Sequence, residues 1–258
     1  MGLLEVLNTT PVVLTILLLF SFLPPVMFLV WVRNTERYGR EPWAVVIKMF
    51  LWGAVFAVII AIVLSLLLAV AYNTIVPVYV ALGNQQTLQT IVLALVIAPF
   101  VEEGAKAIGV FGATFNINQV QDGIVYGASS GLGFSATENL FYGVAVLIAM
   151  GPALSISLIV LRSVSSTLLH ASATSAVGYG IGKNVVSKGR YRVLPFYLLA
   201  VGMHSCFNFF ASFGELLKDS LGDYAGLIGF AAAWILAIVA FSLARARIIK
   251  DEKSSPVN

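Results

Sequence analysis

The sequence has few charged residues and almost no cysteine. Charged side chains make up 10% of its 258 residues, while 59% are hydrophobic and the mean hydropathy is +0.95. Soluble domains usually carry about 25% charged residues, so the composition excludes a soluble globular fold. One cysteine, Cys206, excludes an internal disulfide, and we expect it to be a buried apolar residue. The basic residues form no dense stripe, so nucleic acid is not expected as a partner.

The sequence contains several long runs of apolar residues. A bilayer core about 30 Å thick needs roughly 20 apolar residues per crossing helix. We expect a single all-α polytopic transmembrane domain over 1–258 with about seven helices, or eight if the third segment is split near Pro99. A short polar tail, 245–258, is expected to be disordered. The apolar segments run near 9–32, 44–72, 87–113, 123–148, 155–181, 194–213 and 223–244.

Lysine and arginine are concentrated in three of the connecting or terminal segments, at 33–40, 183–192 and 245–253. With seven spans these three lie on one side of the membrane, and the other side has only Lys218. Cytoplasmic loops are enriched in Lys and Arg. We therefore expect the N-terminus outside and the C-terminus in the cytoplasm.

Ionisable residues interrupt the apolar segments, where a buried charge is costly and usually has a function. In the string VEEGAK, Glu102 and Lys106 are four residues apart and share a helix face, with Glu103 beside them. Two adjacent carboxylates at low dielectric do not both ionise easily, so one should hold a proton or pair with Lys106. Such a set can supply a general base and a general acid, the alternative being a structural ion pair.

The two histidines of the chain lie on the fifth and sixth segments. His204 and Asn208, in HSCFN, are four residues apart; they could stabilise an oxyanion or join two helices by a hydrogen bond. His170 follows several serines on the fifth segment. Two histidines on neighbouring segments, with carboxylates nearby, favour a site over an isolated core residue.

Glycines at 123, 127 and 131 repeat every four residues ahead of Glu138 and Asn139. This spacing lets two helix backbones approach closely, which would bring Glu138 towards its neighbours. At about 1.5 Å per residue from the expected cytoplasmic ends, Glu102, His170 and His204 lie roughly 15–17 Å deep and Glu138 roughly 22 Å deep. Similar depths on four segments predict one convergent site.

Several protease motifs are missing. The chain has no HExxH helix, no GxSxG elbow and no pair of intramembrane aspartates. The available Glu, His and Asn side chains suit water activation by a carboxylate, with His and Asn stabilising an oxyanion. On this interpretation no metal or other cofactor is needed. The same residues could also bind zinc, and two histidines could hold a haem.

The ordered motifs EEGAK, DGIVYGASSGLGFSATEN, His170 and HSCFN resemble the PrsW family of intramembrane proteases, over roughly 95–210. That family is grouped with the CAAX-protease and bacteriocin-processing (CPBP) glutamic-type membrane proteases. The resemblance implies that Glu102 is the water-activating base and Glu103 its partner. It further implies that His204 and Asn208 stabilise the oxyanion and that His170 helps position the water. Lys106, Glu138 and Asn139 would support them.

The resemblance also implies a substrate, a membrane-embedded or membrane-proximal protein such as an anti-sigma factor, and the plasma membrane of a prokaryote. In the CAAX branch the second motif has a histidine four residues after phenylalanine, whereas here Phe134 is followed by Glu138. Glutamate at this position is typical of the PrsW branch, so processing of prenylated proteins is not expected. The same superfamily includes a non-catalytic gamma-secretase subunit, so a membrane scaffold is the alternative function.

Overall fold

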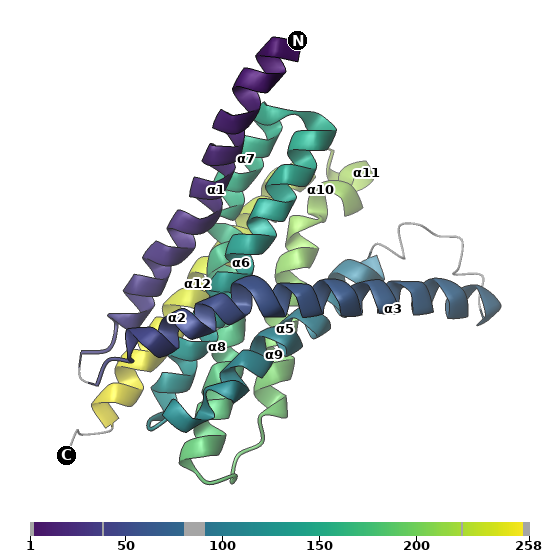
Figure 1. The fold of residues 1–258 in the computed structure, drawn as a ribbon. Helices are drawn as coiled ribbons and strands as arrows, with labels where there is room; N and C mark the ends of the chain where they lie inside the picture. Colours follow the sequence, from purple (N-terminus) through teal and green to yellow (C-terminus); the bar gives the residue numbers. More distant parts are fainter. Residues whose placement is uncertain (1–2, 38, 80–90, 223, 255–258) are drawn as a thin grey trace.

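The computed structural model describes residues 3–37, 39–79, 91–222 and 224–254, and within these ranges all regular elements are helices (Figure 1). The first part of the chain forms α1 (Leu3–Arg33), α2 (Trp43–Leu51), the π-helix η1 (Trp52–Ala57) and α3 (Val58–Tyr79). The middle forms η3 (Leu93–Ile97), α5 (Ala98–Gly112), the short η4 (Thr114–Asn116), α6 (Val120–Met150), α7 (Pro152–Arg162) and α8 (Ser165–Val186). The last part forms α9 (Leu194–Ala211), α10 (Phe213–Leu216), α11 (Lys218–Leu221) and α12 (Tyr224–Ser254).

Six helical stretches of the described residues are long and apolar enough to cross a membrane. They are Pro11–Arg33, Trp43–Thr74, Val120–Met150, Pro152–Val186, Leu194–Ala211 and Tyr224–Lys253. Six of the seven expected segments correspond to them, so an all-α membrane protein is confirmed, while a count of seven or eight is not. The expected segment 87–113 begins outside the described residues; from 91 to 112 it is helical, but it carries three charged residues. This charged helix packs against α3, α6, α8 and α9.

The rod formed by α2, η1 and α3 crosses the other long helices at a steep angle, and the far end of α3 extends beyond them (Figure 1). Where the rod crosses α6, glycine allows close contact: a Cβ on Gly53 would lie 1.9 Å from the Ser130 carbonyl oxygen. On the projecting part of α3, Leu66 and Val70 are more than 60% exposed. Such an apolar exposed face is the one expected towards lipid.

The predicted glycine contact is confirmed between α6 and α8. A Cβ on Gly123, Gly127 or Gly131 would lie 2.2–2.3 Å from a backbone carbonyl oxygen of α8. For Gly131 that oxygen belongs to His170. The absence of side chains on this face of α6 therefore sets the distance between the helix with Glu138 and the helix with His170.

Pro99 follows a π-helical turn on the helix that bears the paired glutamates. Proline has no backbone N–H, so carbonyl groups one turn earlier lose a donor. Ser205 on α9 donates its hydroxyl to the Leu95 carbonyl at 2.7 Å, and Asn208 donates its amide to the Ala94 carbonyl at 2.8 Å. Side chains of a neighbouring helix often satisfy such groups inside a membrane. These two bonds join α9 to the segment that leads into α5.

Two expectations are wrong. The tail was expected to be disordered after Arg245, but α12 continues to Ser254, because polar residues such as Arg247 and Asp251 pair one turn apart at 2.9 Å. Residues 255–258 lie outside the described part. Cys206 was expected to be buried, yet it is exposed on α9. A small apolar thiol is tolerated on a surface that faces lipid.

Candidate active site

Glu103 is the buried anchor of the site. It is 0% exposed, and its carboxylate accepts a hydrogen bond from Lys106 Nζ at 2.6 Å and from Thr174 Oγ1 at 2.9 Å. Nδ1 of His204 lies 3.0 Å from the same carboxylate. A buried carboxylate needs this number of partners, because charge is costly to bury unless it is paired and hydrogen-bonded. Glu103 thereby fixes both Lys106 and the ring of His204.

Lys106 lies at the centre of the cluster and is also 0% exposed. The sequence predicted that it pairs with one of the two glutamates, and Glu103 is the nearer partner at 2.6 Å, while Glu102 Oε2 is 3.8 Å from Nζ. Nζ is also 2.9 Å from Nδ1 of His170 and 4.4 Å from the ring centre of Phe134. An ammonium group is only a donor, so His170 accepts at Nδ1 and carries its proton on Nε2.

Glu138 accepts the hydrogen bond that His170 donates from Nε2. His170 Nε2 is 2.9 Å from Glu138 Oε2, and Arg162 Nη2 donates to the same oxygen at 2.7 Å. Arg162 also donates from Nε to Oδ1 of Asn139 at 3.0 Å, and Asn139 donates in turn to Ser135 and Thr167. Asn139 therefore orients the arginine, which holds the carboxylate of Glu138.

Glu102 differs from its neighbours because Oε2 has no hydrogen-bond partner among the described residues, although the atom is buried. This oxygen lies 3.8 Å from Nε2 of His204. The other ring nitrogen of His204 faces Glu103, so the two groups that face each other here are a carboxylate oxygen and an imidazole nitrogen. A separation of 3.8 Å is too long for a direct hydrogen bond, so one water molecule can contact both groups.

Both Glu102 and Glu138 line a cavity of about 280 Å³ between α3, α5 and α6. Its wall is mostly apolar, with Ile62, Phe141 and Tyr142 at 44%, 50% and 47% exposed. The cavity is thus open at the side of the bundle, between α3 and α6. A larger cavity of about 450 Å³ lies between α9 and α12 and contains none of the ionisable cluster.

These contacts bring residues 102, 103, 106, 138, 170 and 204 together, as the matched depths predicted. The motifs come from α5, α6, α8 and α9 in the order that the sequence resemblance required. A sequence model described as "PrsW family intramembrane metalloprotease" matches residues 41–243, which include the whole cluster.

The chain belongs to the PrsW family. Proteins named "Protease PrsW" from Clostridioides difficile (strain 630) and Geobacillus kaustophilus (strain HTA426) are 28% and 30% identical to it. The alignments cover 75% and 82% of this chain and 78% and 84% of the relatives. A third, from Shouchella clausii (strain KSM-K16), is 25% identical over 85% of the chain. No solved structure matches significantly.

PrsW membership makes this chain an integral membrane protease, as the resemblance predicted. The family description names a metal, so we tested the residues for one. One ligand atom each from Glu102, His170 and His204 lies within 4.8 Å of the others, and both residue types, Glu and His, suit zinc. A metal-bound histidine usually donates its second ring N–H to a carboxylate or carbonyl.

His204 meets that requirement, because its Nδ1 faces Glu103. His170 does not: its Nδ1 faces the ammonium group of Lys106, and its Nε2 is hydrogen-bonded to Glu138. With these hydrogen bonds neither nitrogen of His170 has a lone pair free for a metal. The arrangement therefore does not fit a zinc ion held by all three residues.

The amide nitrogen of Asn208 donates to the Ala94 carbonyl and not to a residue of the cluster. Its assignment to the oxyanion stays a prediction without support from this contact. No role was predicted for Arg162. The signal was available, because an arginine in an apolar segment requires a carboxylate partner, and Glu138 is the one it contacts.

A second carboxylate cluster was missed altogether. Glu36, Glu41 and Asp122 are each less than 5% exposed, with ligand atoms within 4.8 Å, and the Tyr126 hydroxyl donates to Glu41. Burial and the neighbouring carboxylates raise the pKa of Glu36 to about 8, and burial raises the pKa of Glu41 to about 7. Asp122 lies three residues after Gln119, the N-cap of α6, and accepts the backbone N–H groups of Asn118 and Gln119.

Proposed function

We propose that this chain is an endopeptidase that hydrolyses a peptide bond of a membrane-embedded or membrane-proximal protein, with Glu102 as the base that activates water. The observation that carries the proposal is the buried, unpartnered Oε2 of Glu102, which faces Nε2 of His204 at 3.8 Å inside a laterally open cavity. Four other charged groups surround this pair and are already paired with one another.

The charge of the cluster supports this assignment. Its charged members, apart from the histidines, are Glu102, Glu103, Glu138, Lys106 and Arg162. Three carboxylates and two cations leave one negative charge, which one further proton balances. The hydrogen bonds of His170 leave no acceptor for that proton, so it belongs to the Glu102–His204 pair. With the proton on His204, Glu102 is a carboxylate that can act as a base.

The reaction then has two proton transfers. Glu102 takes a proton from water while the water oxygen attacks the scissile carbonyl carbon. The carbonyl oxygen becomes negative and accepts a hydrogen bond from Nε2–H of His204, whose Nδ1–H is fixed by Glu103. The C–N bond breaks as Glu102 returns the proton to the leaving nitrogen, which gives a carboxylic acid and an amine. His170 and Glu138 hold Lys106 and the cavity wall in place.

The substrate reaches the cavity from the side. The opening between α3 and α6 is lined by exposed apolar and aromatic residues, which suit a transmembrane or membrane-anchored segment rather than a soluble peptide. A protein of the anti-sigma-factor type, as the family resemblance implies, is our first candidate. In keeping with the distribution of Lys and Arg, we place the C-terminus in the cytoplasm of a prokaryotic cell.

The test is a comparison of Glu102→Gln with Glu252→Gln, a matched change at a glutamate remote from the cluster. Each variant is co-expressed with tagged single-span membrane proteins, and fragments are identified by mass spectrometry. We expect fragments with wild type and Glu252→Gln but not with Glu102→Gln, at equal melting temperatures. Unchanged fragments in Glu102→Gln would reject the assigned base, and the lack of fragments from any variant would favour a non-catalytic scaffold.

A further inference from the structure

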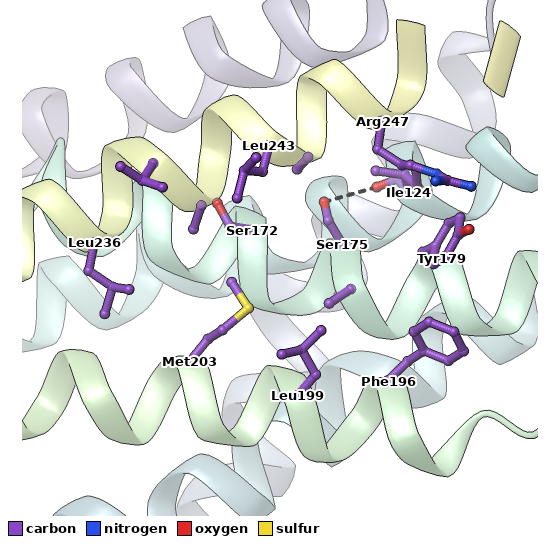
Figure 2. Close-up of a pocket in the computed structure, with 14 residues that line it drawn as sticks. Ile124, Ser172, Ser175, Tyr179, Phe196, Leu199, Met203, Leu236, Leu243 and Arg247 are labelled. Carbon is purple, nitrogen blue, oxygen red and sulfur yellow. Dashed lines mark hydrogen bonds between the residues drawn. The ribbon is translucent and has the colours of Figure 1, made fainter. Parts of the chain in front are cut away.

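A groove lies on the side of α8 and α9 that faces away from His170 and His204. It has a volume of about 450 Å³ and lies between α9 and α12 over the surface of α8 (Figure 2). Ser172 comes two residues after His170, and Met203 precedes His204. Groove and cluster therefore lie on different faces of the same two helices.

The walls of the groove are apolar. Leu199 and Met203 come from α9, and Leu236 and Leu243 come from α12 (Figure 2). The two serine hydroxyl groups of the groove are already satisfied, because Ser172 donates to the Leu168 carbonyl and Ser175 donates to the Ile124 carbonyl. What the groove offers along most of its length is hydrocarbon surface. A hydrocarbon chain is the ligand that such a surface fits.

One end of the groove is basic. Arg247 and Tyr179 lie together at this end, and Leu236 lies at the other (Figure 2). The Arg247 guanidinium is 4.7 Å from the ring centre of Tyr179, and Nζ of Lys183 is 5.5 Å from the same centre. Arg247 is paired at Nε with Asp251, while no carboxylate among the described residues lies within 4.0 Å of Lys183. The end therefore carries a net positive charge.

The length of the groove matches one leaflet. Leu236 and Arg247 are eleven positions apart on α12, which at about 1.5 Å per residue is roughly 16 Å. Half of a hydrocarbon core of about 30 Å is roughly 15 Å. A helix about 10 Å across would occupy roughly 1,250 Å³ over this length, so the groove, at about 450 Å³, cannot enclose a transmembrane segment.

We propose that this groove binds one acyl chain of an anionic phospholipid, with the phosphate held by Arg247 and Lys183. Basic pockets between transmembrane helices are a known setting for anionic headgroups. The lipid would fill the gap between α9 and α12 and press α9, with His204, against α8, with His170. Bound lipid should therefore raise the thermal stability of the protein.

The experiment measures binding directly and does not depend on protease activity. Delipidated full-length protein in detergent is titrated with phosphatidylglycerol or phosphatidylcholine, and bound lipid is counted by native mass spectrometry. Each cation near an anionic headgroup is worth about fivefold in affinity, so Arg247→Gln with Lys183→Gln should weaken phosphatidylglycerol binding about 25-fold. Arg245→Gln, which removes a cation that contacts Thr35 and Trp31 outside the groove, should leave binding unchanged.

A second variant tests the groove itself. Leu243→Trp should fill the groove and lower the affinity for phosphatidylglycerol, while its melting temperature without lipid stays at or above that of wild type. Equal binding of the two lipids, or unchanged binding in Leu243→Trp and in the double variant, would overturn the proposal and indicate non-specific lipid. Stabilisation by inorganic phosphate equal to that by phosphatidylglycerol would also overturn it, because the acyl chain would then contribute nothing.

Discussion

The carboxylate of Glu102 and the imidazole of His204 face each other across 3.8 Å, and Glu103 holds the far side of that imidazole at 3.0 Å. Two adjacent glutamates thus have different surroundings. Glu103 is enclosed and fully paired, whereas Glu102 reaches a cavity with one oxygen unpartnered. In the proposed mechanism this difference is why Glu102 acts as the base and Glu103 holds the ring of His204.

His204→Gln tests the oxyanion role. The amide can replace one ring hydrogen bond but carries no positive charge, so cleavage should fall about 100-fold or more. The measurement is the cleavage rate of a fixed amount of folded protein. His204→Gln with a rate within threefold of wild type would contradict the assignment.

Lys106→Met tests the buried ion pair. The substitution leaves Glu103 buried without its closest cation, a change that costs about 3–5 kcal/mol in buried pairs. We expect a large fall in the melting temperature. The double variant Glu103→Gln with Lys106→Met should recover part of the loss, since no unpaired charge then remains. A melting temperature unchanged by Lys106→Met alone would show that the pair contributes nothing.

Gly131→Ala tests the contact between α6 and α8. The added Cβ would meet the His170 carbonyl oxygen at 2.2 Å, so the helices must separate and the Glu138–His170 bond must lengthen. Stability and cleavage should both fall. Gly202→Ala on α9 is the matched control, because its Cβ would meet no atom within 4 Å. Equal melting temperatures for the two variants would contradict the packing described.

The Glu36–Glu41–Asp122 cluster gives a pH dependence of stability. The pKa of Glu36 is raised from 4.5 to about 8 in the folded protein, so between these pH values the folded state binds more protons than the unfolded state. The free energy of unfolding should therefore fall as the pH rises from 5 to 8. The groups that face Glu36 and Glu41 are Asp122, Tyr126, Arg33 and Glu252.

Glu36→Gln removes the titrating group and should flatten that pH profile, as followed by the melting temperature in detergent. Glu252→Gln changes a glutamate that accepts from the backbone of Arg37 and should keep most of the slope. A wild-type protein that gains stability as the pH rises from 5 to 8 would contradict the cluster's protonation.

Asn208→Ala distinguishes a structural from a catalytic amide. Because the side chain satisfies the Ala94 carbonyl, its loss should cost about 1–3 kcal/mol of stability. Ser205→Ala, which frees the neighbouring Leu95 carbonyl, should behave alike. If Asn208→Ala alone abolished cleavage at an unchanged melting temperature, the amide would belong to the oxyanion site after all.

The sequence was sufficient for the motif-bearing helices and for the convergence of their charged residues. Long apolar segments predict crossing helices, and the glycine repeat before Glu138 predicts the close pairing of α6 with α8. Both follow from local patterns and the cost of burying polar groups in lipid. The family could be recognised from the sequence for the same reason, since its motifs consist of these buried polar residues.

The sequence did not predict which side chains pair with one another in the folded protein. Spacing of four residues put Lys106 on one helix face with Glu102, and His204 on one face with Asn208, but it did not identify their closest partners. These are Glu103 for Lys106 and, for Asn208, a backbone carbonyl released before Pro99. Rotation of one helix about its axis decides these partners, and a single sequence does not specify it. The missed cluster of Glu36, Glu41 and Asp122 joins a connecting segment to the start of α6, a contact that periodicity does not reveal.

The most direct test of the central claim uses purified protein reconstituted with a cleaved transmembrane substrate. Cleavage by wild type and Glu102→Gln is timed in the same lipid, and zinc is quantified in both samples. We predict at least a 1,000-fold loss in Glu102→Gln at an unchanged melting temperature, as for removal of a general base, with wild-type activity that resists chelators. Cleavage by Glu102→Gln would contradict the account, and so would one zinc per chain with activity abolished by its removal.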